Sequence, residues 1–175
     1  QALFSLIGIV VLVTFSYIPF RLYRVLVYPV LAAAIVMLVA VVFSGLGVTA
    51  GGSARWLQLG PVQFQPSELA RLALVIYMAY SMSKKGEQLR DFYVGFLPHF
   101  LVLGLFTGLL LVQPDFGSIV IFAALTWIML FVGGCRISHL LSVVLVLAPM
   151  AWLFMTHAEY RVKRLMSFMD PWQYP

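Results

Sequence analysis

The sequence predicts an all-α polytopic membrane protein. Of its 175 residues, 63% are hydrophobic and only 10% are charged, whereas a soluble domain has about 25% charged residues. The apolar residues form runs long enough to cross a hydrocarbon core of about 30 Å if tilt is allowed. One long polar stretch, residues 51–71, separates two of these runs and has no hydrophobic period of its own.

Composition excludes several other classes of protein. The formal net charge of +5 forms no basic patch on a soluble face, so nucleic acid is not an expected partner. The single cysteine, Cys135, rules out a disulfide within the chain, and the histidines show no metal-ligand spacing. Gln1 opens directly into an apolar run without a charged leader, and Pro175 stops within a loop. We therefore expect an internal fragment of a longer chain.

Six membrane spans follow from the uncharged runs and from the breaks between them. Proline, glycine and charged residues end the runs. The approximate spans are residues 1–20, 25–43, 67–82, 94–113, 116–132 and 137–155. Together they predict a single transmembrane domain over residues 1–175.

The distribution of positive charge assigns the two faces of this domain. The loops of one face carry Arg21, Arg24, Lys84, Lys85, Arg90 and Arg136. The other face holds the loop 44–66, the 113–117 turn and the tail 156–175. Because the first face has more lysine and arginine on short loops, it is predicted to be cytoplasmic, and the second extracytoplasmic.

Two of the extracytoplasmic segments have local patterns of their own. Leu59-Gly60-Pro61-Val62 is typical of a turn between two short extended pieces, 55–59 and 62–65. In the tail, apolar and basic residues fall on opposite helical faces between positions 159 and 170, which indicates an amphipathic interfacial helix.

Arg71 is the most informative single residue, because it enters the apolar zone one turn inside the third span. An arginine at the centre of a membrane helix costs about 2.5–3.5 kcal/mol on insertion scales, and less near an interface. Glu68, Asp115 or an anionic ligand would compensate this charge. Ser67 is the expected N-cap of the helix, with Glu68 in its first turn. A substrate site and a snorkelling arginine paired with Glu68 are both open interpretations.

Other polar residues also admit two interpretations each. Arg55 and Trp56 place a guanidinium that can bind phosphate beside an amphipathic indole ring. Alternatively, Trp56 belongs to the aromatic belt at the membrane interface and Arg55 contacts lipid headgroups. Asp115 caps the fifth helix, or serves as counter-ion to one of the arginines. His99 is expected to be packed and hydrogen-bonded within the fourth span. From the residues alone, a transporter, a lipid-processing enzyme and a scaffold all remain open.

Three ordered motifs resemble signatures of the SEDS family, the bacterial shape, elongation, division and sporulation proteins. The motifs are residues 52–57 with 59–71, residues 113–118, and residues 160–172. The ending Asp170-Pro171-Trp172 is more similar to the division member of this family than to the elongation member. The resemblance implies a fold of roughly ten transmembrane helices, of which this chain holds the second to the seventh.

The resemblance also implies an activity and a set of partners. The expected activity is that of a glycosyltransferase that polymerises peptidoglycan strands from lipid II in septal synthesis during cell division. The alternatives are an elongation polymerase, a lipid II flippase and a non-catalytic division scaffold. Expected partners are lipid II, a class B penicillin-binding protein, divisome subunits and membrane lipids, in the bacterial cytoplasmic (inner) membrane.

Charge pattern and resemblance together assign a substrate-binding half-site. Its residues are Arg55, Trp56, Gln65, Ser67, Glu68, Arg71 and Asp115. The two arginines would contact the substrate pyrophosphate, since charge-assisted contacts to phosphate are strong in a partly desolvated site. The two carboxylates would hold the arginines, and Trp56 would line the entrance. The family's catalytic aspartate lies in a later His-Thr-Asp-Phe-type motif, so it is expected beyond Pro175. The sequence leaves the cofactor unknown: it contains no metal motif, and a divalent cation is compatible with it.

Overall fold

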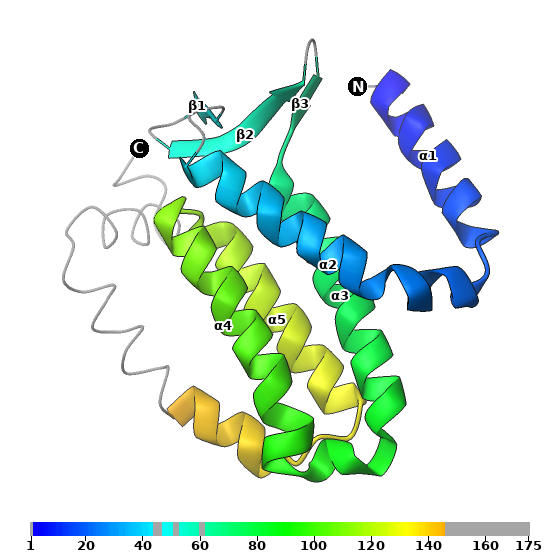
Figure 1. Ribbon diagram of the computed structural model, residues 1–175, viewed down its shortest axis with the longest axis vertical. Helices are drawn as coiled ribbons and strands as arrows, with labels where there is room; N and C mark the ends of the chain where they lie inside the picture. Colours follow the sequence, from blue (N-terminus) through cyan, green and yellow to red (C-terminus); the bar gives the residue numbers. More distant parts are fainter. Residues whose placement is uncertain (1, 44–46, 51–52, 60–61, 146–175) are drawn as a thin grey trace, which may run out of the picture.

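The computed structural model describes residues 2–43, 47–50, 53–59 and 62–145. Its helices form a bundle with a small sheet at one end (Figure 1). The bundle consists of α2 (Phe20–Phe43), α3 (Pro66–Lys85), α4 (Leu97–Val112) and α5 (Phe116–Val132). The first helix, α1 (Ala2–Ser16), stands apart from the bundle, and its described side chains are exposed.

The helices follow the apolar runs, with differences at their ends. α5 has the bounds expected of the fifth run, whereas α2 begins at Phe20 instead of residue 25 and continues through Pro29. A further helix covers residues 137–145. The remainder of the expected sixth span, 146–155, and the expected amphipathic segment 159–170 lie outside the described residues.

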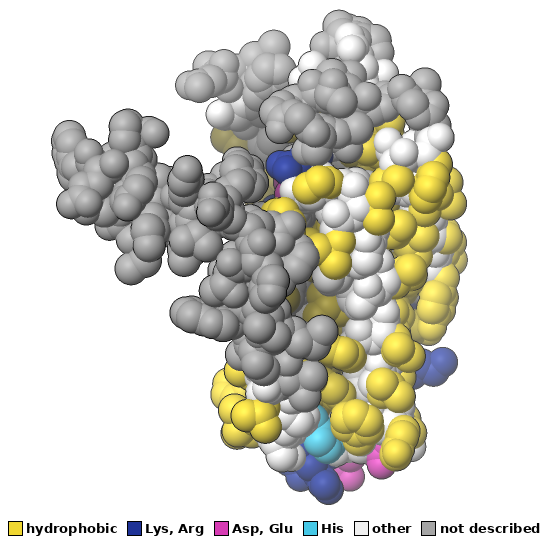
Figure 2. Space-filling model, turned by 90° about the vertical axis from the view of Figure 1, so that its left-hand side faces the viewer, with side chains coloured by type: hydrophobic (Ala, Val, Ile, Leu, Met, Phe, Trp, Pro, Cys, Tyr) yellow, Lys and Arg dark blue, Asp and Glu magenta, His cyan; other side chains and the backbone are white. Residues whose placement is uncertain are grey.

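The surface of the bundle is that of a helical membrane protein. Phe20–Phe43 and Phe92–Val112 are long and apolar enough to cross a membrane, while Ser5–Ser16 and Phe116–Val132 are apolar but shorter. Many large hydrophobic side chains on these helices are exposed. Figure 2 shows hydrophobic side chains over the middle of one face and charged side chains gathered at its lower end. Six membrane crossings stay a prediction.

The core lies between α2, α3, α4 and α5. Phe106 of α4 and Phe122 of α5 are fully buried and meet edge to face, with ring centroids 5.4 Å apart. Ala34 on α2 and Ala70 and Ala73 on α3 are fully buried as well. Small residues of this kind let membrane helices approach one another closely.

The polar stretch forms a three-stranded antiparallel sheet in the order β1-β2-β3. β2 (Ser53–Leu59) and β3 (Val62–Phe64) correspond to the two expected extended pieces, and the turn 60–61 lies outside the described residues. β1 (Gly47–Ala50) was not expected, because a short segment with glycine shows no alternating pattern. It pairs with β2 across a bulge between Val48 and Thr49. The structure is thus mostly helical, as expected, and the polar stretch, which was expected to be a structured loop, forms a small sheet.

Two short irregular helices connect α3 to α4 at the end of the bundle opposite the sheet. They are a 3₁₀-helix, Gly86–Arg90, and a π-helix, Phe92–Phe96. The Asp91 carboxylate accepts hydrogen bonds from the backbone N–H groups of Tyr93 at 2.8 Å and Val94 at 3.0 Å, and so caps the π-helix.

Candidate functional site

Asp115 is buried at the start of α5, accepts hydrogen bonds from two parts of the chain and forms an ion pair with a third. Ser118 Oγ donates to it at 2.6 Å and Ser118 N at 3.4 Å. Gln65 Nε2 donates at 3.3 Å from the start of α3, and Arg55 Nη1 of β2 lies 3.9 Å away. Only 6% of Asp115 is exposed, so these groups replace the water that a buried carboxylate requires. Asp115 is thus both a helix cap and a counter-ion, which combines the two sequence-based interpretations.

Arg55 joins the sheet to the turn between α4 and α5. Its Nη2 donates to the carbonyl oxygen of Pro114 at 2.6 Å, and its Nε to that of Gln113 at 3.4 Å. The Gln113 side chain is buried and donates to the carbonyl oxygen of Leu38 on α2 at 3.0 Å. The guanidinium therefore connects β2 to a turn that is itself tied to α2.

Arg71 lies one turn inside α3 and forms a bidentate ion pair with Glu68. Nη1 and Nη2 each lie 3.1 Å from a Glu68 carboxylate oxygen. The two side chains are 30% and 52% exposed, and ion pairs this accessible contribute about 0–1 kcal/mol. The Arg71 Nε is buried and has no partner among the described residues. Exchange of Glu68 for an anionic ligand would therefore cost little.

Ser67 does not cap α3, which corrects the sequence-based expectation. The N-cap position is Gln65, and Pro66 is the first helical residue. Proline is favoured there because its φ is already helical and it has no N–H group to satisfy. Ser67 is buried inside the first turn, and its Oγ has no hydrogen-bond partner among the described residues. The Gln65 side chain reaches Asp115 and not the N–H groups of its own helix.

Five of the seven predicted site residues thus form two groups at the sheet end of the bundle, and Trp56 and Ser67 belong to neither group. Arg55, Gln65 and Asp115 share one network, while Glu68 and Arg71 form a separate pair. The groups are adjacent, because Glu68 N donates to the Gln65 carbonyl oxygen at 3.0 Å. Trp56 is half-buried on β2, with Val48 as its cross-strand partner.

Two residues of the network were not predicted individually. The Gln113 carbonyl oxygen accepts a hydrogen bond from Arg55, and the Ser118 hydroxyl donates one to Asp115. Both belong to the motif 113–118, so the signal was their polarity between two apolar helices. Among the described residues, no three His, Cys, Asp or Glu side chains gather closely enough to hold a metal ion.

His99 is packed inside the bundle, as its sequence context predicts. It is fully buried, its Nδ1 is hydrogen-bonded to the Gly95 carbonyl oxygen, and its ring centroid lies 5.9 Å from that of Tyr77.

Comparison with known proteins places the chain in a family. The FtsW/RodA/SpoVE model, described as a cell cycle protein, matches residues 1–175. A relative from Geobacter sp. (strain M18) is named probable peptidoglycan glycosyltransferase FtsW. It is 38% identical over 100% of this chain and 48% of its own length. A relative of the same name from Trichlorobacter lovleyi is 39% identical over 100% of this chain and 46% of its own length.

Solved structures share the fold. A chain from a peptidoglycan synthase complex that coordinates polymerization and crosslinking superposes with a TM-score of 0.80 at 27% identity. The match covers 98% of this chain and 50% of that one. Thermus thermophilus RodA, a rod shape determining protein, gives 0.67 at 28% identity over 82% of this chain and 46% of that one. The chain spans about half the length of the proteins that it matches.

Proposed function

Since this chain belongs to the FtsW/RodA/SpoVE family of cell cycle proteins, we propose that the whole protein polymerises peptidoglycan strands from lipid II. Relatives over the full chain are named probable peptidoglycan glycosyltransferase FtsW, which supports a role in septal synthesis during division. The likeness to a RodA structure supports a second candidate function, which is strand polymerisation during cell elongation. The likeness to a peptidoglycan synthase complex supports a class B penicillin-binding protein as partner.

The observation that carries this proposal is the accessible Arg71–Glu68 pair beside the buried Asp115 network. Pyrophosphate would take the place of the Glu68 carboxylate on the Arg71 guanidinium, whose planar fork matches phosphate oxygens. A cation at this position stabilises the charge that develops on a pyrophosphate leaving group. The carboxylate that activates the acceptor hydroxyl would come from another part of the protein.

Arg55 has a different role in this proposal, because its three nitrogens already face the 113–115 turn. It would hold the sheet against the bundle and present one exposed edge to the substrate. Gln65 and Asp115 would fix that edge, and Trp56 would line the route for the lipid or sugar. In the predicted topology the sheet end is extracytoplasmic, so the proposed polymerisation would take place on that side of the membrane.

The test is lipid II polymerisation by the full-length protein with its partner present. We expect Arg71→Ala to lower the rate at least tenfold while the protein stays folded, since a lost charge-assisted hydrogen bond costs about 1.5–3 kcal/mol. The matched control is Arg21→Ala, an exposed arginine at the far end of α2. Unchanged polymerisation by the Arg71→Ala protein would exclude the pyrophosphate role.

A further inference from the structure

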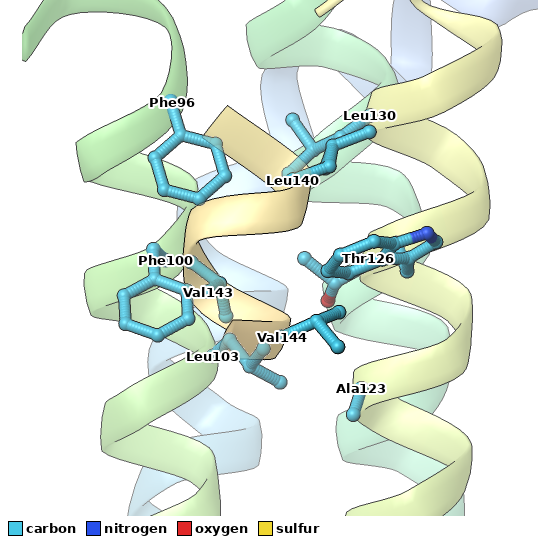
Figure 3. Close-up of a pocket in the computed structure, with 10 residues that line it drawn as sticks. Phe96, Phe100, Leu103, Ala123, Thr126, Leu130, Leu140, Val143 and Val144 are labelled. Atoms are coloured by element: carbon cyan, nitrogen blue, oxygen red, sulfur yellow. The ribbon is translucent and has the colours of Figure 1, made fainter. Parts of the chain in front are cut away.

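α4, α5 and the helix 137–145 line a partly open apolar cavity of about 300 Å³ (Figure 3). Its walls include Phe100 and Leu103 of α4, Ala123 and Trp127 of α5, and Val143 and Val144 of the last helix. The polar groups of the lining are the Thr126 hydroxyl, which has no partner among the described residues, and the Trp127 indole. A stable buried water requires about two to four polar partners, so the cavity favours hydrocarbon over water.

A polar hollow of about 530 Å³ lies next to this cavity, at the end of the bundle opposite the sheet. A layer of aromatic rings separates the two spaces. Phe96 lines the cavity and His139 lines the hollow, and their ring centroids are 5.8 Å apart. Phe92 lines the hollow and stacks on Phe96, with centroids 5.5 Å apart. A molecule that occupied both spaces would therefore cross only one layer of side chains.

The lining of the hollow contains two arginines and two carboxylates, and Lys84 and Lys85 at the end of α3 directly precede it, so this end of the bundle is net positive. Arg90 and Arg136 line it, and the ion pairs of the described part of the chain are the two at the sheet end. His139 Nδ1 is buried without a hydrogen-bond partner there. Of the charged side chains in the lining, Asp91 accepts two backbone hydrogen bonds of the π-helix, whereas Glu87, Arg90 and Arg136 are exposed and form no ion pair among the described residues. The helix 137–145 begins directly after Arg136, which adds the positive end of a helix dipole.

We propose that the hollow and the cavity form one site for an anionic membrane phospholipid. Its phosphate contacts Arg90, Arg136 and His139, and one acyl chain lies in the cavity beyond the ring of Phe96. The basic residues at the hollow favour a negatively charged headgroup. The adjoining apolar cavity favours a ligand with an acyl chain over a free phosphate ion. This site lies at the end of the bundle opposite Arg71 and does not depend on the proposed polymerase activity. In the predicted topology its headgroup faces the cytoplasmic leaflet, which is rich in anionic lipids.

Trp127 provides a direct probe, because it lines the cavity. The full-length protein with Trp127 as its only tryptophan is placed in lipid nanodiscs that contain phosphatidylglycerol or phosphatidylcholine with brominated acyl chains. Bromine quenches tryptophan fluorescence on contact. We expect quenching at a several-fold lower mole fraction of the brominated phosphatidylglycerol, since each basic residue near the headgroup adds about a fivefold preference.

Variants separate the proposed site from general lipid contact. The double variant Arg90→Gln/Arg136→Gln should lose the preference for phosphatidylglycerol, whereas the matched control Arg21→Gln should keep it. If the double variant does not fold, Ala123→Phe fills the cavity with both arginines present and should reduce quenching by brominated phosphatidylglycerol. Equal quenching by both lipids, no quenching by either, or an Ala123→Phe protein quenched like the parent would overturn the proposal.

Discussion

Removal of the Asp115 carboxylate should destabilise the fold more than removal of any ordinary helix cap. In the Asp115→Ala protein, the Ser118 hydroxyl loses a charge-assisted hydrogen bond at 2.6 Å, which costs about 1.5–3 kcal/mol. Loss of the cap to Ser118 N adds about 0.5–1 kcal/mol. The Arg55 contact adds little, because it spans 3.9 Å and the arginine is 31% exposed. We expect a total of about 3 kcal/mol.

Asp91→Ala is the matched control, since Asp91 also caps a helix but is exposed. Its removal should cost about 1 kcal/mol. Asp115→Asn keeps an acceptor for Ser118 and loses only the charge, so its cost should lie between those of the two alanine variants. The assay is unfolding in detergent, followed by helical circular dichroism. If Asp115→Ala were no more destabilising than Asp91→Ala, the buried network would not stabilise the sheet end as described.

Three further predictions concern other parts of the chain. Gly95→Ala should destabilise by more than 2 kcal/mol, because a Cβ there would lie 2.6 Å from the Leu89 Cα; Gly104→Ala, which meets open space, is the control in the same unfolding assay. Burial raises the pKa of the Cys135 thiol, so maleimide labelling should be slow at neutral pH. The free energy of unfolding should fall as the pH rises above the usual thiol pKa, because the thiol of the unfolded chain ionises first. Labelling of Cys135 as fast as that of an exposed cysteine would contradict its burial. Glu68→Ala should change the free energy of unfolding by less than about 1 kcal/mol, and a larger loss would make the pair structural.

The helices were predictable from the sequence because their signals are local. A long uncharged run between Asp115 and Gly133 determines α5 without reference to any other element. β1 was not predictable, since its pairing with β2 depends on the tertiary position of the polar stretch. The prediction that Ser67 is the N-cap of α3 was wrong, because the neighbouring Pro66 is favoured at the first helical position and moves the cap to Gln65.

Five of the predicted site residues lie together at the sheet end, and their role in binding stays a prediction, but the contacts among them were not predictable. Sequence separation explains why: Arg55 and Asp115 meet only because the sheet folds onto the turn between α4 and α5. The pair Arg71–Glu68 was predictable because residues three apart share a helix face. The contacts that each arginine makes could not be inferred from its residue type. For this reason the sequence-based prediction placed both Arg55 and Arg71 on the pyrophosphate.

The most direct test of the proposed site is the affinity of undecaprenyl pyrophosphate for the full-length protein, measured for the parent, Arg71→Ala and Glu68→Ala. If Arg71 binds the pyrophosphate in place of Glu68, Arg71→Ala should weaken binding about tenfold to a hundredfold. Glu68→Ala should bind at least as tightly as the parent, because the competing carboxylate is gone. Equal affinities for the parent and a folded Arg71→Ala protein would contradict the proposal.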